Sequence, residues 1–109
     1  MRNRVFQMLG IAAKSGSIVS GEFSTEKAVK TGHAYMVIVS EEASDNTKKM
    51  FTNMTDFYEV PMYTFGTKDE LGRCIGKQFR ASLAITDENL ANAVEAKLQA
   101  VKLNNGGNI

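Results

Sequence analysis

The segment GKQFRAS, residues 76–82, contains the side chains best suited to contact a nucleic acid. Lys77 and Arg80 can hold phosphates, and Phe79 lies between them, where its ring can stack on an unpaired base. Single-stranded and looped RNA is commonly bound by this combination of stacking and charge. The alternative is that Phe79 covers the hydrophobic core, and the sequence leaves both interpretations open.

Other basic residues come from separate segments of the chain. The formal net charge of +1 excludes binding of polyanions through bulk charge alone. A local basic face can still form, although any solvated surface also carries scattered lysines. The basic residues concerned are Lys14, Lys27, Lys48, Lys49, Lys77 and Arg80. A nucleic-acid site therefore depends on where the fold places them.

Residue types that serve as catalysts are sparse. The one histidine, His33, follows a glycine that predicts a helix end, where a cation is favourable without any catalytic role. Cys74 lies on the apolar stripe of its predicted helix, with no histidine within seven residues. We expect it to be a buried structural thiol rather than a nucleophile.

Cofactor and metal sites are not indicated either. Glu41, Glu42 and Asp45 could hold a hard cation, but acidic residues also gather near helix N-termini without any metal. No pair of Cys or His residues provides zinc ligands, and no glycine-rich phosphate loop of the Walker or dinucleotide type occurs. We expect no enzyme activity, no cofactor and no metal.

Length and composition indicate a single domain. A chain of 109 residues with 43% hydrophobic residues suits one compact core, which we assign to residues 1–103, with NNGGNI at 104–109 as a disordered tail. Apolar runs of about five residues fall far short of the roughly 20 that span a bilayer, and no signal peptide is apparent. A single cysteine fits a reducing compartment. We expect a cytoplasmic monomer without membrane contacts.

Five helices must position these side chains. The first begins with Asn3 as its cap and ends at Ser15-Gly16-Ser17, and the second runs from Gly21 to Thr31-Gly32. Ser44 predicts the cap of a third helix that ends before Pro61. Thr67 and Glu70 predict a capping box for a fourth helix, which Gly76 ends. The last helix carries Leu90, Val94, Leu98 and Val101 on one face.

Four short strands alternate with these helices, at Ile18-Val19 and at residues 35–40, 61–65 and 81–86. The run YMVIVS at 35–40 is nearly all apolar, which predicts a strand at the sheet centre, buried on both faces. The alternation predicts a three-layer α/β domain on a four-stranded sheet. Ligands bind such sheets where strands end and helices begin, which here collects Ser20-Gly21-Glu22, residues 40–46 and Gly66-Thr67.

The segments VSGE, SEEASDNTKK and LGRCIGKQFR, in this order on this pattern of elements, resemble the ribosomal protein L7Ae/L30e superfamily, specifically its bacterial YlxQ-like branch. The resemblance covers residues 5–95. It implies an L30e-like α/β/α sandwich with a four-stranded mixed sheet. Generic crossovers would put the loop before the last strand at the far edge of the sheet, but the family fold reverses that strand.

Many members of this superfamily bind kink-turns, which are bent RNA helices with sheared G·A pairs and an extruded base. The resemblance implies that the N-terminus of the second helix enters the RNA groove and that the loop before the last strand closes over the extruded base. Together with the basic residue Lys48, these places give the residues that we assign to RNA: Gly21, Glu22, Phe23, Ser24, Lys27, Lys48, Lys77, Gln78, Phe79 and Arg80. Gly21 would allow close approach of the RNA backbone, and Lys27 would meet a phosphate.

This chain departs from the family at the helix entrance. Classical kink-turn binders carry approximately G-T-N-E-x-T-K, whereas this chain reads GEFSTEK at residues 21–27. The carboxylate that reads guanine is therefore missing from its place, and Glu22 and Glu26 oppose phosphate. Glu26 can also pair with Lys30 one helical turn away. Phe23 is either a buried first-turn anchor or an exposed aromatic where relatives read a base pair.

We expect a non-catalytic, cytoplasmic ribonucleoprotein component that binds structured RNA, either ribosomal or kink-turn-like. Ribosome-associated or translation-associated proteins are further expected partners. The alternative is a protein-interaction or ribosome-assembly module that keeps the scaffold and has lost kink-turn specificity. A small-ligand or metal-dependent enzyme is a third and weaker hypothesis. Fold alone does not choose among these functions.

Overall fold

The computed structural model describes residues 2–107, with side chains described as far as Val101. The elements follow the order α1 (Arg2–Lys14), β1 (Ile18–Ser20), α2 (Glu22–Lys30), β2 (Met36–Val39), α3 (Asp45–Tyr58), β3 (Met62–Thr64), α4 (Lys68–Cys74), β4 (Ser82–Ile85) and α5 (Glu88–Gly107). The predicted alternation of helices and strands is confirmed.

The C-terminal helix is longer than the sequence pattern predicted. α5 continues to Gly107 and so includes residues 104–107 of the segment for which we predicted a disordered tail. Residues 108–109 of that segment lie outside the described part of the chain. The domain limit at residue 103 stays a prediction.

The four strands form one mixed sheet in the order β1-β4-β2-β3. β2 and β3 are parallel, whereas β4 runs antiparallel to both β1 and β2, with Ala84 paired to Val19 and Val37. The reversed last strand and the central place of β2 are therefore confirmed. Because β4 is reversed, its first residue lies beside the last residues of β1 and β2.

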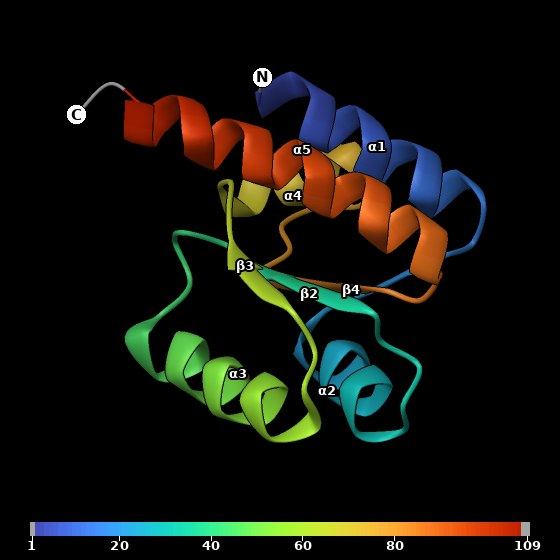
Figure 1. The fold of residues 1–109 in the computed structure, drawn as a ribbon. Coiled ribbons are helices and arrows are strands. Elements are labelled where there is room, and N and C mark those ends of the chain that lie inside the picture. The colour runs from blue at the N-terminus through green and yellow to red at the C-terminus, as the bar shows by residue number, and fades with distance from the viewer. Residues whose placement is uncertain (1, 108–109) are drawn as a thin grey trace.

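Helices cover both faces of the sheet, as Figure 1 shows, with α1, α4 and α5 on one face and α2 and α3 on the other. The side chains of β2 alternate between the two layers, because Met36 and Ile38 pack with α1, α4 and α5 while Val37 and Val39 pack with α2 and α3. The three-layer α/β/α sandwich is confirmed, and it explains why all four residues of β2 are buried.

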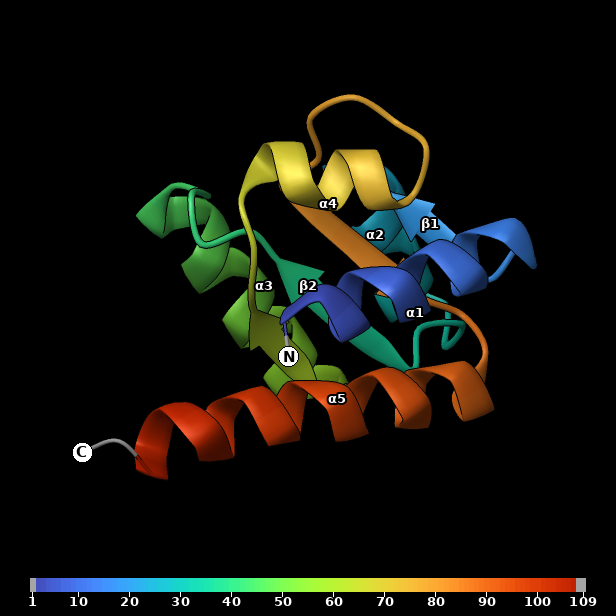
Figure 2. The same ribbon diagram turned by 90° about the horizontal axis from the view of Figure 1, so that it is seen from above.

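The predicted helix starts at Ser44 and Thr67 are also confirmed. Ser44 accepts a hydrogen bond from the Thr47 N–H, and Thr67 forms a complete capping box with Glu70. The capping box fixes the beginning of α4, and the chain after α4 arches over that helix before it enters β4 (Figure 2). Within the described residues, no helix combines the length and apolar character needed to cross a membrane.

Candidate nucleic-acid interface

The ends of β1 and β2 and the beginning of β4 meet at one edge of the sheet. The Gly21 N–H donates to the Ser82 carbonyl over 2.9 Å, and the Ser40 N–H donates to the Ala81 carbonyl over 2.8 Å. The Ser40 hydroxyl in turn donates to the Gly66 carbonyl over 3.0 Å. These bonds gather the three segments that the sequence predicted at a ligand edge, and they add the loop before β4.

The entrance of α2 leaves several backbone donors open. Gly21 is the N-cap with φ 92° and makes no side-chain cap. Within the described chain, no protein acceptor is found for the N–H groups of Glu22, Phe23 and Ser24. A Cβ at Gly21 would meet no atom within 4 Å, so the backbone conformation, and not crowding inside the protein, requires glycine. The open donors and the helix dipole favour a negatively charged partner.

α2 carries acidic and basic side chains near an exposed aromatic ring. Phe23 is 77% exposed, which decides between the two predicted alternatives in favour of a surface residue. Lys27 and Glu22 are exposed on the same helix, and Ser24 is partly buried. The predicted pair of Glu26 and Lys30 is confirmed, with 3.0 Å between the carboxylate oxygen and Lys30 Nζ.

The loop at residues 76–81 is held to α4 at two points. The Lys77 N–H donates to the Gly72 carbonyl over 2.8 Å, and the Arg80 N–H donates to the Lys68 carbonyl over 3.1 Å. Between these anchors, Phe79 is 69% exposed, so its ring does not cover the core. Lys77 and Gln78 are exposed as well, and the loop presents three neighbouring side chains to solvent.

Arg80 connects this loop with the entrance of α2. Its Nε donates to the Ser20 hydroxyl over 3.0 Å, and its Nη1 donates to the Phe79 carbonyl over 2.8 Å. Residues 20 and 80 are thus in direct contact, although about 60 positions separate them in the sequence. The guanidinium holds both parts of the edge in fixed relation and stays partly exposed.

Gly72 is a positioning residue that the sequence reasoning missed. A Cβ at Gly72 would lie 1.4 Å from the Gln78 carbonyl oxygen, so only glycine allows the loop to lie this close to α4. The available signal was a glycine inside a helical pattern, which often marks close backbone approach. Ser20 was also missed as the partner of Arg80.

The contacts of Lys48 do not connect it with the other predicted residues. It belongs to the first turn of α3, and its backbone N–H donates to the Ser44 carbonyl over 2.9 Å. Among the described residues, no hydrogen bond or ion pair joins Lys48 to α2 or to the loop at 76–81. Nine of the ten predicted residues therefore lie in the two segments that the contact of Arg80 with Ser20 joins, and Lys48 lies on a third element.

The acidic residues after β2 have structural partners. A carboxylate oxygen of Glu42 accepts the Lys68 N–H over 2.9 Å at the beginning of α4. Glu41 lies 3.8 Å from Arg2, whose guanidinium also pairs with Glu70 and stacks over the Phe65 ring. These contacts account for the charges of Glu41 and Glu42 by ion pairing and helix capping. Within the described residues, no group of three or more candidate ligands is arranged to hold a metal.

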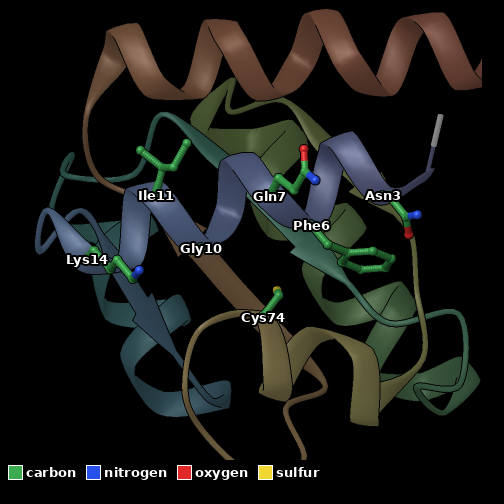
Figure 3. A pocket seen from close by; sticks show the side chains of 7 residues that line it. All are labelled: Asn3, Phe6, Gln7, Gly10, Ile11, Lys14 and Cys74. Atoms are coloured by element: carbon green, nitrogen blue, oxygen red, sulfur yellow. The ribbon is translucent and has the colours of Figure 1, made fainter.

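The side chains of Cys74 and His33 make no hydrogen bond with the two interface segments among the described residues. Burial raises the pKa of the Cys74 thiol to about 11, so the thiol is protonated at neutral pH. Cys74 lies beside a hollow of about 690 Å³ between α1 and α4, lined mainly by apolar atoms of Phe6, Gly10 and Ile11 (Figure 3). His33 is exposed, and its Nδ1 lies 2.8 Å from the Thr31 hydroxyl. Neither residue has the neighbours of a nucleophile or a general base.

Comparisons with known proteins show which family this sequence is similar to. A family model described as the ribosomal protein L7Ae/L30e/S12e/Gadd45 family matches residues 3–95. The RNA-binding protein YlxQ of Bacillus subtilis is 38% identical over 87 residues, which cover 80% of this chain and 87% of that protein. The large ribosomal subunit protein eL30 of Methanosphaera stadtmanae is 32% identical over 79 residues, covering 72% of this chain and 81% of that protein.

A solved structure supports the same fold. The Giardia lamblia 15.5kD RNA binding protein superposes with a TM-score of 0.75 at 22% identity, covering 90% of this chain and 84% of that one. At this identity the likeness concerns the fold alone. The names of the matched family and relatives describe ribosomal and RNA-binding proteins rather than enzymes.

Proposed function

Because the chain belongs to the ribosomal protein L7Ae/L30e/S12e/Gadd45 family, in its YlxQ-like branch, we propose that it is a non-catalytic, monomeric RNA-binding protein of the cytoplasm. Its ligand is structured RNA, either ribosomal or kink-turn-like. The binding surface consists of the N-terminus of α2 and the loop at residues 76–81. One observation carries this proposal, which is the contact between Arg80 and Ser20 that joins the two segments.

The backbone of α2 and the side chains around it have complementary roles. The open N–H groups that follow Gly21 face the phosphate backbone, and the missing side chain at Gly21 leaves room for its approach. Lys27 and Lys77 neutralise phosphates, and Phe79 packs against an extruded base. Arg80 contacts phosphate with the part of its guanidinium that Ser20 and the Phe79 carbonyl leave free.

Kink-turn specificity is the finer part of the proposal. Phe23 and Ser24 occupy the places where classical binders contact G·A pairs, and the exposed Phe23 ring has no group that can hydrogen-bond to a base edge. Lys27 keeps its place beside the expected phosphate path. We therefore expect this protein to prefer RNA with a bent internal loop, while distinguishing G·A pairs less sharply than classical binders.

A titration with labelled RNA tests this function. We expect the protein to bind a kink-turn RNA more tightly than a version with its G·A pairs replaced, and equal affinity for the two would refute kink-turn specificity. If several lysines contact phosphates, the affinity should fall about 10-fold or more between about 50 and 200 mM salt. Lys27→Ala and Arg80→Ala should each weaken binding without unfolding the domain. Unchanged affinity in both variants would move the site elsewhere.

A protein-interaction module is the second candidate, and one observation favours it. Phe57 is 79% exposed and Tyr58 is 42% exposed, and their rings form an edge-to-face pair at the C-terminal end of α3. This end lies at the opposite edge of the sheet, where the Pro61 carbonyl accepts the Val37 N–H. Ribosome-associated or translation-associated proteins could dock there. Unchanged RNA binding with loss of a co-purifying partner in Phe57→Ala would support this role.

A further inference from the structure

Phe23 and Phe79 lie in two surface hollows of the same construction. Each hollow has a volume of about 270 Å³, and each is lined by one exposed phenylalanine, an acidic residue and two basic residues. The first contains Phe23, Glu26, Lys27 and Lys30, together with Thr31. The second contains Asp69, Arg73, Lys77 and Phe79, together with Gln78.

The charges in the two hollows are also distributed in the same way. Glu26 pairs with Lys30 over 3.0 Å, and Asp69 pairs with Arg73 over 3.0 Å, in each case one helical turn apart. The remaining lysines, Lys27 and Lys77, have no carboxylate within 4.0 Å among the described residues. Each hollow therefore contains an exposed phenyl ring, an ion pair on the helix surface whose two charges neutralise each other, and one lysine that can bind an anion.

The exposed Phe23 ring makes no contact that stabilises the fold among the described residues. It is 77% exposed, and it takes no part in the aromatic contacts of the described residues, which join Phe6 to Phe65 and Phe57 to Tyr58. It also does not belong to either hydrophobic cluster of the fold. The favourable free energy of covering this ring therefore becomes available only when a ligand binds.

The side chains that line the Phe23 hollow suit a nucleotide. The base of a nucleotide has a flat π-face that can stack on a phenyl ring. The phosphate of the same nucleotide can pair with Lys27, which has no carboxylate partner among the described residues. Because phenylalanine neither donates nor accepts hydrogen bonds, such a contact holds any base that is unpaired and gives little discrimination among bases.

We propose that Phe23 is a second stacking platform, on which an unpaired base of the bound RNA lies against the ring with its phosphate beside Lys27. This inference rests on the proposed RNA-binding function and specifies the class of RNA. The preferred RNA has two accessible unpaired bases, one for Phe79 and one for Phe23. In this chain, stacking at α2 replaces hydrogen bonding to a G·A pair.

The test combines protein variants with abasic RNA. The probes are a fluorescein-labelled kink-turn RNA and derivatives that each carry one abasic site at an unpaired position, titrated by fluorescence anisotropy at about 50 mM salt, where phosphate contacts are strong. Phe23→Ala should weaken binding about 5- to 150-fold, which corresponds to the loss of one stacked base. For the native protein, one of the abasic RNAs should bind more weakly than the intact RNA. For Phe23→Ala, the same abasic RNA and the intact RNA should bind with equal affinity.

Matched variants separate stacking from simple apolar contact. Phe23→Tyr should bind within about 3-fold of the native protein because it keeps an aromatic face, whereas Phe23→Leu should be as weak as Phe23→Ala. Phe57→Ala removes an equally exposed ring elsewhere and should bind like the native protein. Native-like binding by Phe23→Leu would overturn the proposal, because an apolar contact, as in a protein interface, would then suffice.

Failure of this inference differs from failure of the proposed function. If the native protein binds RNA and Arg80→Ala weakens it, while Phe23→Ala binds like Phe57→Ala, the interface stands and the Phe23 platform is refuted. The platform is equally refuted if every abasic site weakens the native protein and Phe23→Ala by the same factor. If the native protein binds none of the probes, binding of kink-turn RNA and the Phe23 platform are both refuted.

Discussion

Gly72→Ala should displace the loop that carries Phe79 while leaving the rest of the fold in place. A Cβ at this position would lie 1.4 Å from the Gln78 carbonyl oxygen and 2.4 Å from its carbon. Because ordinary contacts begin at 3.4 Å, the carbonyl must move by about 2 Å, the difference between these distances. The atoms that the new Cβ would meet belong to the backbone of Gln78 and Phe79, so no side chain can rotate away to relieve the clash.

The free-energy cost follows from two opposing terms. Forcing an additional methyl group into a packed region costs about 1–3 kcal/mol, and a clash with backbone at this distance belongs at the upper end. Replacing glycine by alanine inside a helix returns about 1 kcal/mol. We therefore expect a net loss of about 2 kcal/mol, which lowers the Tm by about 8–16 °C for a domain of this size.

Gly10→Ala provides a matched control for this measurement. Gly10 is also helical and also faces a backbone carbonyl, but its Cβ would lie 3.1 Å from the Cys74 oxygen, so a shift of a few tenths of an ångström suffices. We expect this variant to keep its Tm within a few degrees, because the gain in helix propensity offsets a small strain. Circular dichroism melts of the two variants measure the difference.

RNA titrations below the Tm then report on the loop. Displacement of Phe79 and Arg80 should weaken RNA binding by Gly72→Ala about 10-fold or more, the effect of losing at least one stacked base. A Tm and an affinity that both match the native protein would refute the close packing of the loop on α4. A lower Tm with native affinity would instead exclude the loop from the RNA surface.

Four further predictions concern the free energy of unfolding and the Cys74 thiol. Thr67→Ala removes the side-chain half of the capping box on α4, in which the Glu70 N–H donates to Thr67 over 3.0 Å, and should lower the free energy of unfolding by about 1 kcal/mol in urea titrations. Phe51 is completely buried, so Phe51→Ala should cost about 3–5 kcal/mol by the same assay, and a cost below 1 kcal/mol would contradict its place in the core. Because burial raises the pKa of Cys74 from 9.0 to about 11, iodoacetamide should modify the folded protein at pH 8 far more slowly than the unfolded chain. In the unfolded chain this thiol ionises at lower pH than in the folded protein, so its contribution to stability should be intact below pH 9.0 and should decline up to about pH 11, a decline that Cys74→Ala should lack.

Local chemistry was predicted from the sequence where a few neighbouring residues determine it. Ser44 and Thr67 cap helices through contacts only three residues away, so their side-chain types are sufficient signals. The continuous apolar run at residues 36–39 likewise predicts a strand covered on both faces, and all four side chains are buried. The resemblance to a known family supplied the reversed strand, which the alternation of elements alone did not indicate.

Features that depend on distant segments were not predicted from the pattern. Whether Phe23 is buried depends on whether another element covers the first turn of α2, and neither its spacing nor its type determines that. The contact between Ser20 and Arg80 requires the antiparallel placement of β4, and the need for glycine at position 72 arises from a loop that returns over α4. Such close approaches are tertiary properties, so a sequence pattern marks only the residues that permit them.

The reversed strand at the middle of the sheet also constrains how this chain acquires its structure during synthesis. β4 separates β1 from β2, so β1 has no neighbouring strand and β2 has only β3 until residues 82–85 have left the ribosome. Closing such distant pairings is slow because the intervening chain must first lose conformational freedom. Until then, the unpaired edges of β1 and β2 are exposed to association with other chains. The bonds that complete the sheet also bring Ser20 beside Arg80, so a nascent chain would gain its stable fold and the surface proposed to bind RNA in the same late step.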